Sequence, residues 1–321
     1  MQGKPYLSFR EDKSFRILHL TDIQEGLFPR KDTLKLIRAM LKKADPDLVI
    51  LTGDQLKGYD PLLKLSGKSG IQKTIHQIME PFEQSGIPYA VTFGNHDVQC
   101  GLSNEEQAEI YRQLSGCICE NDGPGAGTFL LPLHNRSGQE VFMIYVLDSG
   151  NTGEKGGYHP PAKEVLTWLK SSLSAENHWK ASMVFQHIPL PEYKKCRGVE
   201  IKEPICSPDI NAGEFEILQR SGNVTGVFCG HDHKNDFLGQ VGGIGLGYTP
   251  SCGFASYGPG VDRGGRLIVL RENTPMQYET RLLKYRNLVA PHTKNRLKEY
   301  WDTHIPTCWP LRKTEEKKEN I

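Results

Sequence analysis

The chain has 321 residues, of which 39 are Lys or Arg and 38 are Asp or Glu, so its formal net charge is +1. This near-neutral balance argues against a polybasic nucleic-acid binder, and 37% hydrophobic with 24% charged residues is typical of a globular protein with a sizeable core. No stretch approaches the roughly eighteen apolar residues of a membrane span, and residues 1–10 are polar, so we expect no membrane span, no signal peptide and a cytoplasmic location. The eight cysteines are too dilute for a disulfide scaffold, and we expect most of them to be buried thiols.

Short apolar runs alternate with stretches of helical periodicity along most of the chain, which is typical of layered α/β proteins. We expect strands at Phe15–Leu20, Leu48–Leu51, Tyr89–Phe93, Val141–Leu147, Met183–Gln186 and Val224–Cys229. The expected helices are Asp32–Ala44, with Asp32 as its N-cap, and Ile71–Gln84, Asn104–Leu114, Pro161–Ser172 and Ile210–Arg220. From Phe237 to Arg281, glycine-rich turns and β-like runs predict a second, partly antiparallel sheet with a tight hairpin at Gly242–Gly247.

No internal repeat or linker interrupts the sequence, which favours one domain. We place an N-terminal segment at residues 1–14, the domain at residues 15–285, and a C-terminal helix with a charged tail at residues 286–321. Trp301 and Trp309 are expected to pack this last helix against the domain, and the charge run beyond Arg312 is typical of a solvated end.

Polar side chains follow five of the expected strands, at the point where each strand ends. Asp22 follows the first, Gly53 and Asp54 the second, Gly94–Asp97 the third, His187 the fourth and Gly230–His233 the fifth. Ligands of open α/β sheets bind beyond the carboxyl ends of the strands, so we expect these side chains at one edge. In three of the five cases a glycine comes directly before the polar residue, which permits a tight turn and a close backbone approach.

The collected side chains offer oxygen and nitrogen ligands from Asp22, Asp54, Asn95, His187, His231 and His233. Such a mixture suits two divalent or trivalent first-row metal ions better than a single structural zinc, which prefers thiolates. Two cations need a bridging anion, and Asp54 at the central strand end is the natural candidate. A single Asp after a strand is more often a turn former, but six such residues on five strand ends are hard to reconcile with chance.

The motifs Asp22-x-Gln24, Gly53-Asp54, Gly94-Asn95-His96-Asp97, His187 and Gly230-His231-Asp232-His233, in this order, resemble those of the calcineurin-like metallophosphoesterases. More narrowly, Leu147–Gly150, Phe185–Tyr193 and Gly230–Phe237 are similar to the plant purple-acid-phosphatase-like and fungal phosphatase branch. The resemblance extends from Phe15 to Leu270, which is most of the chain.

The resemblance implies a four-layer α/β/β/α sandwich around two mixed β-sheets. It implies two metal ions (Mn, Fe, Zn or Mg), one held by Asp22, Asp54 and His233 beside Gln24, and the other held by Asp54, Asn95, His187 and His231. The implied reaction is hydrolysis of a phosphomonoester by in-line attack of a metal-bound hydroxide, with His96 as general acid and Asp97 orienting its imidazole. The implied substrate is a small phosphorylated molecule or a phosphoprotein.

Two positions depart from the family pattern. Gln24 stands where the family usually has histidine, and because an amide is a weaker, neutral ligand, we expect the first metal ion to be held more loosely. The purple members carry a tyrosine at the position of Lys57, so we expect no tyrosinate–iron colour.

Two other functions stay open at this stage. A nucleotide phosphodiesterase would share every ligand and differ only in the walls of the pocket. A catalytically silent scaffold would be expected to have lost His96 or Asp54, and both are present.

Further residues lie close to the motifs in the sequence. A glycine-rich loop at Gly153–Gly157 precedes Tyr158 and His159, and it is either a substrate lid or a surface loop. Three side chains are candidates for contact with the leaving group or with the imidazoles: Tyr193, Asp236 and Tyr257.

Overall fold

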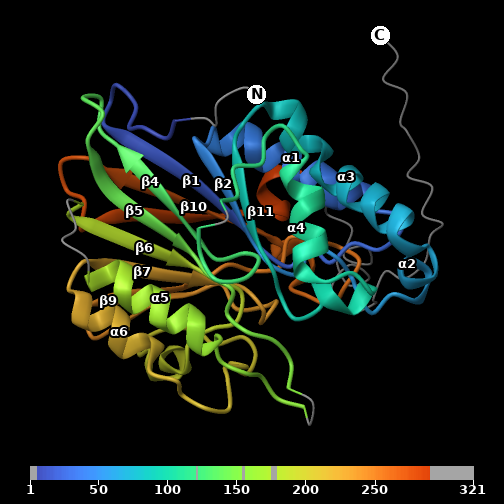
Figure 1. The fold of residues 1–321 in the computed structure, drawn as a ribbon. Helices are drawn as coiled ribbons and strands as arrows, with labels where there is room; N and C mark the ends of the chain where they lie inside the picture. Colours follow the sequence, from blue (N-terminus) through green and yellow to red (C-terminus); the bar gives the residue numbers. More distant parts are fainter. Residues whose placement is uncertain (1–5, 121, 154–155, 175–178, 290–321) are drawn as a thin grey trace.

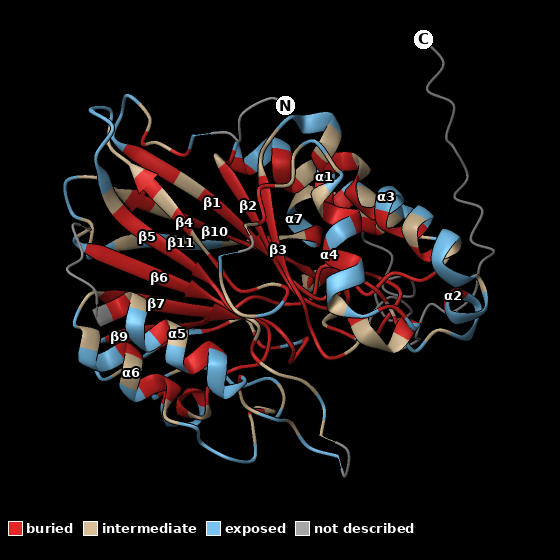
Figure 2. Ribbon diagram, viewed as in Figure 1, coloured by how far each residue is buried: buried red, intermediate tan, exposed pale blue. Residues whose placement is uncertain are grey.

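The computed structural model describes residues 6–120, 122–153, 156–174 and 179–289. Two β-sheets face each other, and helices cover the outer face of each, so the molecule has four layers in the order α/β/β/α (Figure 1). The strands between the helical layers are buried along most of their length, and exposed residues gather on the outer sides of the helices (Figure 2). This is the sandwich of two mixed sheets that the family resemblance implies.

The first sheet has five strands in the order β11-β10-β1-β2-β3. Their bounds are β1 Ser14–Leu20, β2 Leu48–Thr52, β3 Tyr89–Thr92, β10 Gly264–Arg271 and β11 Tyr278–Lys284. Strands β1, β2 and β3 are parallel, and β10 and β11 are added antiparallel. Strand β2 is buried at every residue, as its uninterrupted apolar sequence requires of a strand covered on both faces.

The second sheet has six strands in the order β4-β5-β6-β7-β9-β8. Their bounds are β4 Phe129–His134, β5 Glu140–Val146, β6 Ala181–Phe185, β7 Val224–Cys229, β8 Leu238–Val241 and β9 Ile244–Tyr248. Strands β5, β6, β7 and β9 are parallel, while β4 and β8 close the two edges antiparallel. In both sheets the parallel strands therefore have their carboxyl ends on one edge.

The helices fall into two groups (Figure 1). The group on the first sheet comprises α1 Lys31–Ala44, α2 Pro61–Leu65, α3 Gly67–Ser85, α4 Asn104–Arg112 and α7 Tyr285–Leu288. The second sheet carries α5 Lys163–Ser174 and α6 Glu214–Ser221, and short 3₁₀ turns lie at Asp97–Cys100, Pro191–Lys195 and Gly260–Asp262. Helix α1 buries Leu36, Ile37 and Met40 at helical spacing, which attaches it to the sheet.

Three expectations about the elements need correction. Asp32 is not the N-cap of α1: Arg30 occupies that position, and Asp32 lies in the first turn, where its carboxylate accepts a hydrogen bond from the Tyr285 hydroxyl at 3.1 Å. The strands after residue 237 do not form one sheet, because β8 and β9 extend the second sheet whereas β10 and β11 extend the first. Strand β4 and the short helix α2 were not expected at all.

The tight hairpin is confirmed, because β8 and β9 are joined through Gly242 and Gly243, which both have positive φ. The expected C-terminal packing by Trp301 and Trp309 lies outside the described residues. Among the helices of the described ranges, none is both long enough and apolar enough to cross a bilayer.

Candidate metal centre

The carboxyl ends of β1, β2, β3, β6 and β7 meet at one edge, and backbone hydrogen bonds join the loops that follow them. The Asp22 amide donates to the Gly53 carbonyl at 3.1 Å, and the Gly230 amide donates to the His187 carbonyl at 3.2 Å. The second of these bonds joins the loops after β6 and β7. These bonds fix the positions from which the side chains reach the centre.

The backbone at this edge adopts a left-handed conformation at four residues that are not glycine. Asp22, Gln24, Asp54 and His231 have φ of 51°, 38°, 52° and 75°. Such conformations cost about 1–3 kcal/mol each and persist where the surrounding structure imposes them, often at functional sites. Gly53 also has positive φ, and a Cβ there would lie 2.5 Å from the Gly94 backbone nitrogen, so the turn requires glycine.

Asp22 and His233 face each other through a carboxylate oxygen and an imidazole nitrogen. The second carboxylate oxygen of Asp22, Oδ2, accepts from the Thr21 hydroxyl at 2.8 Å and from the His231 amide at 2.9 Å. His233 Nδ1 lies 2.7 Å from the Tyr257 carbonyl oxygen, so Nδ1 carries a proton, and in the neutral ring Nε2 presents a lone pair. That nitrogen lies 3.3 Å from Asp22 Oδ1, an arrangement that a cation or a proton between the two atoms would stabilise.

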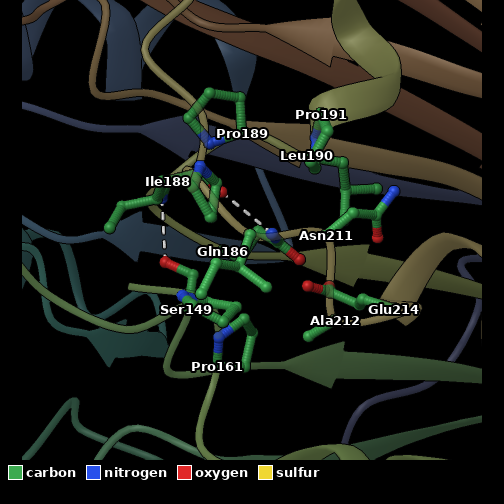
Figure 3. A pocket seen from close by; sticks show the side chains of 13 residues that line it. Ser149, Pro161, Gln186, Ile188, Pro189, Leu190, Pro191, Asn211, Ala212 and Glu214 are labelled. Atoms are coloured by element: carbon green, nitrogen blue, oxygen red, sulfur yellow. Dashed lines mark hydrogen bonds between the residues drawn. The ribbon is translucent and has the colours of Figure 1, made fainter. Parts of the chain in front are cut away.

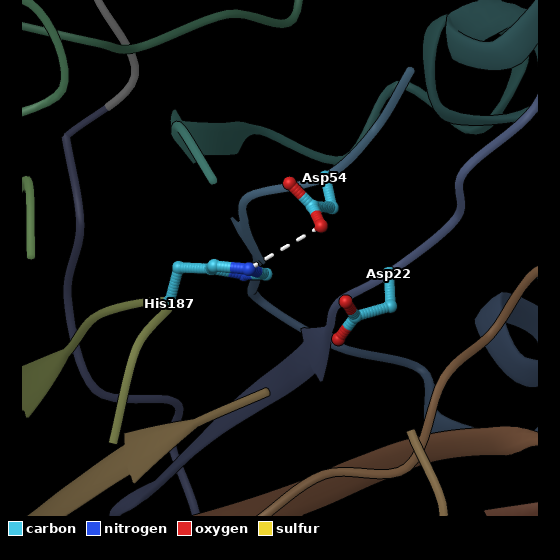
Figure 4. Close-up of side chains that lie close together, drawn as sticks. All are labelled: Asp22, Asp54 and His187. Carbon is cyan, nitrogen blue, oxygen red and sulfur yellow. Dashed lines mark ion pairs between the residues drawn. The ribbon is translucent and has the colours of Figure 1, made fainter. Parts of the chain in front are cut away.

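Asp54 and His187 repeat this arrangement. His187 Nδ1 donates to the Thr52 carbonyl at 2.8 Å, which leaves Nε2 at 3.4 Å from Asp54 Oδ2. Asp22, Asp54 and His187 offer ligand atoms that all lie within 4.8 Å of one another (Figure 4). Imidazoles whose other nitrogen is fixed by a carbonyl are typical of metal ligands in proteins.

His231 and Asn95 complete the set of predicted ligands. His231 Nδ1 lies 3.2 Å from His187 Nε2, and its ring is buried. Asn95 is buried between Gly94 and His96, and its side-chain oxygen has no hydrogen-bond partner in the part of the chain that the structure describes. A buried acceptor without a partner is costly, and a bound cation would satisfy it.

The electrostatics of the centre reflect buried carboxylates beside imidazoles. Burial disfavours a charged imidazole, but Asp54 and Asp22 raise the pKa of His187 to about 10. Burial raises the pKa of a carboxyl group, but His187 at Asp54 and His233 at Asp22 bring both carboxyl pKa values below their usual range. Burial and the neighbouring His187 lower the pKa of His231 to about 3. The two carboxylates thus create a negative potential that favours a cation.

His96 lies at the rim of the centre, with its side chain 31% exposed and its Nε2 at 4.0 Å from Asp54 Oδ2. Its Nδ1 lies 2.9 Å from the Gln99 side-chain oxygen, and the Tyr59 ring packs edge-on against it at 4.8 Å between ring centroids. Gln99 therefore orients the imidazole, with Nδ1 as the donor. The 3₁₀ turn Asp97–Cys100 brings Gln99 back over His96.

The predicted role of Asp97 is wrong. Its carboxylate is fully buried and accepts from three backbone amides, those of Asp54 at 2.7 Å, Gly94 at 2.8 Å and Leu56 at 3.0 Å. Asp97 thus joins the loops after β2 and β3. Burial and then the nearby Asp54 carboxylate raise its pKa to about 7.

Gln24 also differs from its predicted role as a ligand. Its amide nitrogen donates to Asp54 Oδ2 at 2.9 Å, while its amide oxygen lies 3.5 Å from the Tyr59 hydroxyl. An amide NH₂ group has no lone pair to offer a metal ion, so Gln24 positions the oxygen of Asp54 instead.

Besides Tyr59 on His96, two further aromatic rings pack on imidazoles of the centre. The Tyr257 ring stacks on His233, with 4.1 Å between centroids and 7° between planes, and Tyr158 stands edge-on to His231 at 4.4 Å. Tyr257 is therefore beside an imidazole, as the sequence suggested. Tyr193 and Asp236 are not: Tyr193 donates to the Val227 carbonyl at 2.8 Å, and Asp236 forms ion pairs with Lys202 and Lys284. No motif in the sequence indicated that Gln99 and Tyr59 contact His96.

A small cavity with a buried acid in its wall lies at Gln186, the residue before His187. This cavity of about 10 Å³, room for about one water molecule, is lined by Gln186, Glu214, Ser149 and Asn211 among others. The Gln186 and Glu214 side chains point toward each other across it (Figure 3). Burial, and then the nearby Glu192 carboxylate, raise the pKa of Glu214 to about 8, so this acid is neutral at pH 7.

The residues at the centre fit metal ions. Two carboxylates and three imidazoles lie together, two imidazole nitrogens face carboxylate oxygens, and the Asn95 oxygen is buried without a hydrogen-bond partner in the described ranges. This donor set is the kind that divalent first-row ions prefer.

Comparison with known proteins places this centre in a family. The family model described as calcineurin-like phosphoesterase matches residues 15–235. The chain belongs to the calcineurin-like phosphoesterases. It is therefore a phosphoester hydrolase of a metal-dependent family, as its sequence motifs predicted.

Relatives and neighbouring structures agree with this placement. The chain is 27% identical to an Arabidopsis thaliana protein named probable inactive purple acid phosphatase 14, over 80% of this chain and 75% of the relative. It is 25% identical to the Saccharomyces cerevisiae phosphatase DCR2, over 73% of this chain and 46% of the relative. A dimetal phosphatase from Danio rerio has the same fold, with a TM-score of 0.56 and 12% identity over 84% of this chain and 99% of that structure.

Proposed function

We propose that this calcineurin-like phosphoesterase hydrolyses phosphomonoesters with two cations bound at the described edge. Asp22, Asp54 and His233 would hold one cation, and Asp54, Asn95, His187 and His231 would hold the other. When bound, such cations lower the pKa of water and neutralise charge that develops on the phosphoryl group. The facing carboxylate–imidazole pairs, Asp22 with His233 and Asp54 with His187, are the observation that carries the proposal, because a cation between the two atoms of each pair would bind both.

Asp54 is the residue on which the arrangement depends. The His96 amide donates to its Oδ1 at 2.8 Å, and the Gln24 amide donates to its Oδ2 at 2.9 Å. Both oxygens are thereby fixed in a side chain that is 1% exposed. A carboxylate held this firmly can face two cations at once without a reorganisation cost during the reaction.

His96 is the candidate general acid. Its imidazole is partly exposed toward the edge, and the Gln99 oxygen accepts from Nδ1, so Nε2 faces the position of a leaving group. Transfer of a proton from Nε2 to the departing oxygen would contribute about 10²–10⁴ in rate. Asp97 supports this geometry indirectly, because it fixes the Asp54 and Gly94 amides on either side of the site.

The name of the Arabidopsis relative raises a catalytically silent scaffold as a second candidate. This chain keeps His96, and it keeps both carboxylates and all three imidazoles in one buried cluster. We therefore favour the active enzyme.

The test is hydrolysis of p-nitrophenyl phosphate and bis-p-nitrophenyl phosphate by protein purified without chelator, with Mn²⁺ added. We expect the monoester to be cleaved and the activity to be lost with chelator and restored by Mn²⁺. Cleavage of the diester in preference would favour a phosphodiesterase, and hydrolysis of neither compound under any metal would overturn the proposal.

A further inference from the structure

We propose that Tyr59 and Tyr257 form an aromatic subsite that selects aryl leaving groups, of which phosphotyrosine is the protein-borne example. This inference rests on the proposed function, because it assigns the substrate class of the same site. Both rings come from loops at the carboxyl edge, one after β2 and the other between β9 and β10.

Tyr59 lies next to the proposed general acid. His96 would protonate the leaving oxygen, so the group attached to that oxygen must lie next to His96. The Tyr59 ring is 4.8 Å from the His96 ring between centroids and 38% exposed. Its uncovered surface therefore borders the space that a leaving group would fill.

Tyr257 presents a second flat surface, on a loop that contacts Tyr59. One face of its ring is stacked on His233, yet the residue remains 50% exposed, so much of the ring is open to solvent. The Tyr59 hydroxyl lies 3.3 Å from the hydroxyl of Ser256, the residue before Tyr257, so the two loops are adjacent. Lys57 also donates to the Ala255 carbonyl at 2.8 Å, which ties the same loops together.

Arg263 holds the Tyr257 loop in this place. Its buried guanidinium donates to the Ser251 hydroxyl at 2.9 Å and to the Ser256 carbonyl at 2.6 Å. The two aromatic surfaces are therefore preorganised. Ring–ring contacts favour flat aromatic groups over alkyl groups of similar size.

The experiment measures binding of two phosphonates that the enzyme cannot hydrolyse, phenylphosphonate and propylphosphonate, to the Mn²⁺-loaded protein. Calorimetry gives the dissociation constants directly, and competition against p-nitrophenyl phosphate gives inhibition constants. Phosphonates remove the difference in leaving-group reactivity that confounds aryl with alkyl esters. We expect phenylphosphonate to bind about 5- to 10-fold more tightly than propylphosphonate.

The variants are Tyr59→Leu and Tyr257→Leu, singly and together, because leucine keeps apolar packing but removes the flat ring. We expect the double variant to reduce the aryl preference to about twofold or less, and Tyr59→Phe and Tyr257→Phe to retain it. Tyr6→Leu is the matched control: Tyr6 is also an exposed tyrosine stacked on a histidine, His134, at 4.2 Å, and neither residue belongs to the motifs of the site. This control should leave the preference unchanged.

The possible results distinguish a failure of the aromatic subsite from a failure of the proposed hydrolysis. Equal binding of the two phosphonates to the wild type, or an aryl preference that survives in the double leucine variant, would overturn the aromatic subsite while hydrolysis persists. Absence of hydrolysis of any phosphomonoester would instead overturn the proposed function. If Tyr257→Leu disturbs His233 and slows every substrate, the ratio of the two dissociation constants in Tyr59→Leu still decides the matter.

Discussion

Gln186 and His187 are consecutive residues directly after β6, and their side chains enter two different buried environments. Because side chains alternate in direction along an extended chain, His187 faces Asp54 and Asp22, whereas Gln186 faces Glu214 across the small cavity. Both environments contain carboxyl groups that are 5% exposed or less.

In each environment the neighbouring groups decide whether the buried carboxyl group is charged. At the metal centre, burial alone would raise the carboxyl pKa values, but the imidazoles hold Asp22 and Asp54 in their charged forms. At the small cavity, burial and the neighbouring Glu192 raise the pKa of Glu214 to about 8, and the acid is neutral. The comparison shows that similar burial yields charged carboxylates beside imidazoles in one environment and a neutral acid in the other.

The largest expected effect comes from Asp54→Asn, which removes the charge shared by both proposed cation sites. We expect kcat/KM for p-nitrophenyl phosphate to fall by roughly 10³-fold or more. Glu214→Gln is the matched change in the second environment and should leave kcat/KM within about twofold. Near-normal turnover by Asp54→Asn would show that this carboxylate is not central.

His96→Ala should lower kcat by about 10²–10³-fold for alkyl phosphates, because the leaving alkoxide then departs without a proton. The loss should be smaller for p-nitrophenyl phosphate, whose leaving group needs less protonation, and the metal content should not change. The control is His134→Ala, a partly buried histidine of β4 whose Nδ1 lies 3.2 Å from the Leu7 carbonyl. Equal losses for alkyl and nitrophenyl esters would contradict the acid role.

Gln24→Ala should weaken metal binding by about 10- to 100-fold, because Asp54 Oδ2 loses the amide that positions it. Gln24→His should raise the metal affinity of the proposed site at Asp22, Asp54 and His233, chiefly for Zn²⁺, because it places an imidazole next to Asp54. Metal titration of activity on chelator-stripped proteins measures both effects. Identical titration curves for the wild type and both variants would show that Gln24 does not act on the centre.

Glu214 should also make the stability of the protein depend on pH. Glu214 has a folded pKa of about 8, raised from the usual 4.5, so its contribution to stability is complete below pH 4.5 and is lost as the pH rises toward 8. The expected loss is about 1.4 kcal/mol per pH unit within that window. Glu214→Gln should remove this slope.

Urea unfolding at pH 5, 6.5 and 8 on wild type and Glu214→Gln checks this prediction, and the quantity of interest is the difference between the two proteins. The variant should gain relative stability as the pH rises. A difference that stays constant over the three pH values would mean that Glu214 is charged in the folded protein.

Much of the site could be predicted because its signals are local. A fully apolar run such as Leu48–Leu51 identifies a buried strand, and a glycine followed by a polar residue marks its end. Since parallel strands of one sheet share an edge, Asp22 after β1 and Asp54 after β2 come together, and the packing of the second sheet against the first adds His187 after β6. The structure places their ligand atoms within 4.8 Å of one another.

The other features of the site and the fold depend on three-dimensional geometry that the spacing of residues in the sequence does not encode. Asp97 follows His96 directly, but the tight turn aims its carboxylate at backbone amides and returns Gln99 to the imidazole. Strand β4 was missed because Pro132 lies within it, which an edge strand tolerates. The sheet that each late strand joins is decided by the loop of residues 249–263, which joins β9 of one sheet to β10 of the other.

Elemental analysis of protein purified without chelator tests the central claim most directly, with wild type, Asp54→Asn and Glu214→Gln measured side by side. The account predicts two metal ions per chain after Mn²⁺ loading in wild type and in Glu214→Gln, and loss of most of the metal in Asp54→Asn. Two tightly held ions in Asp54→Asn, or none in the loaded wild type, would contradict it.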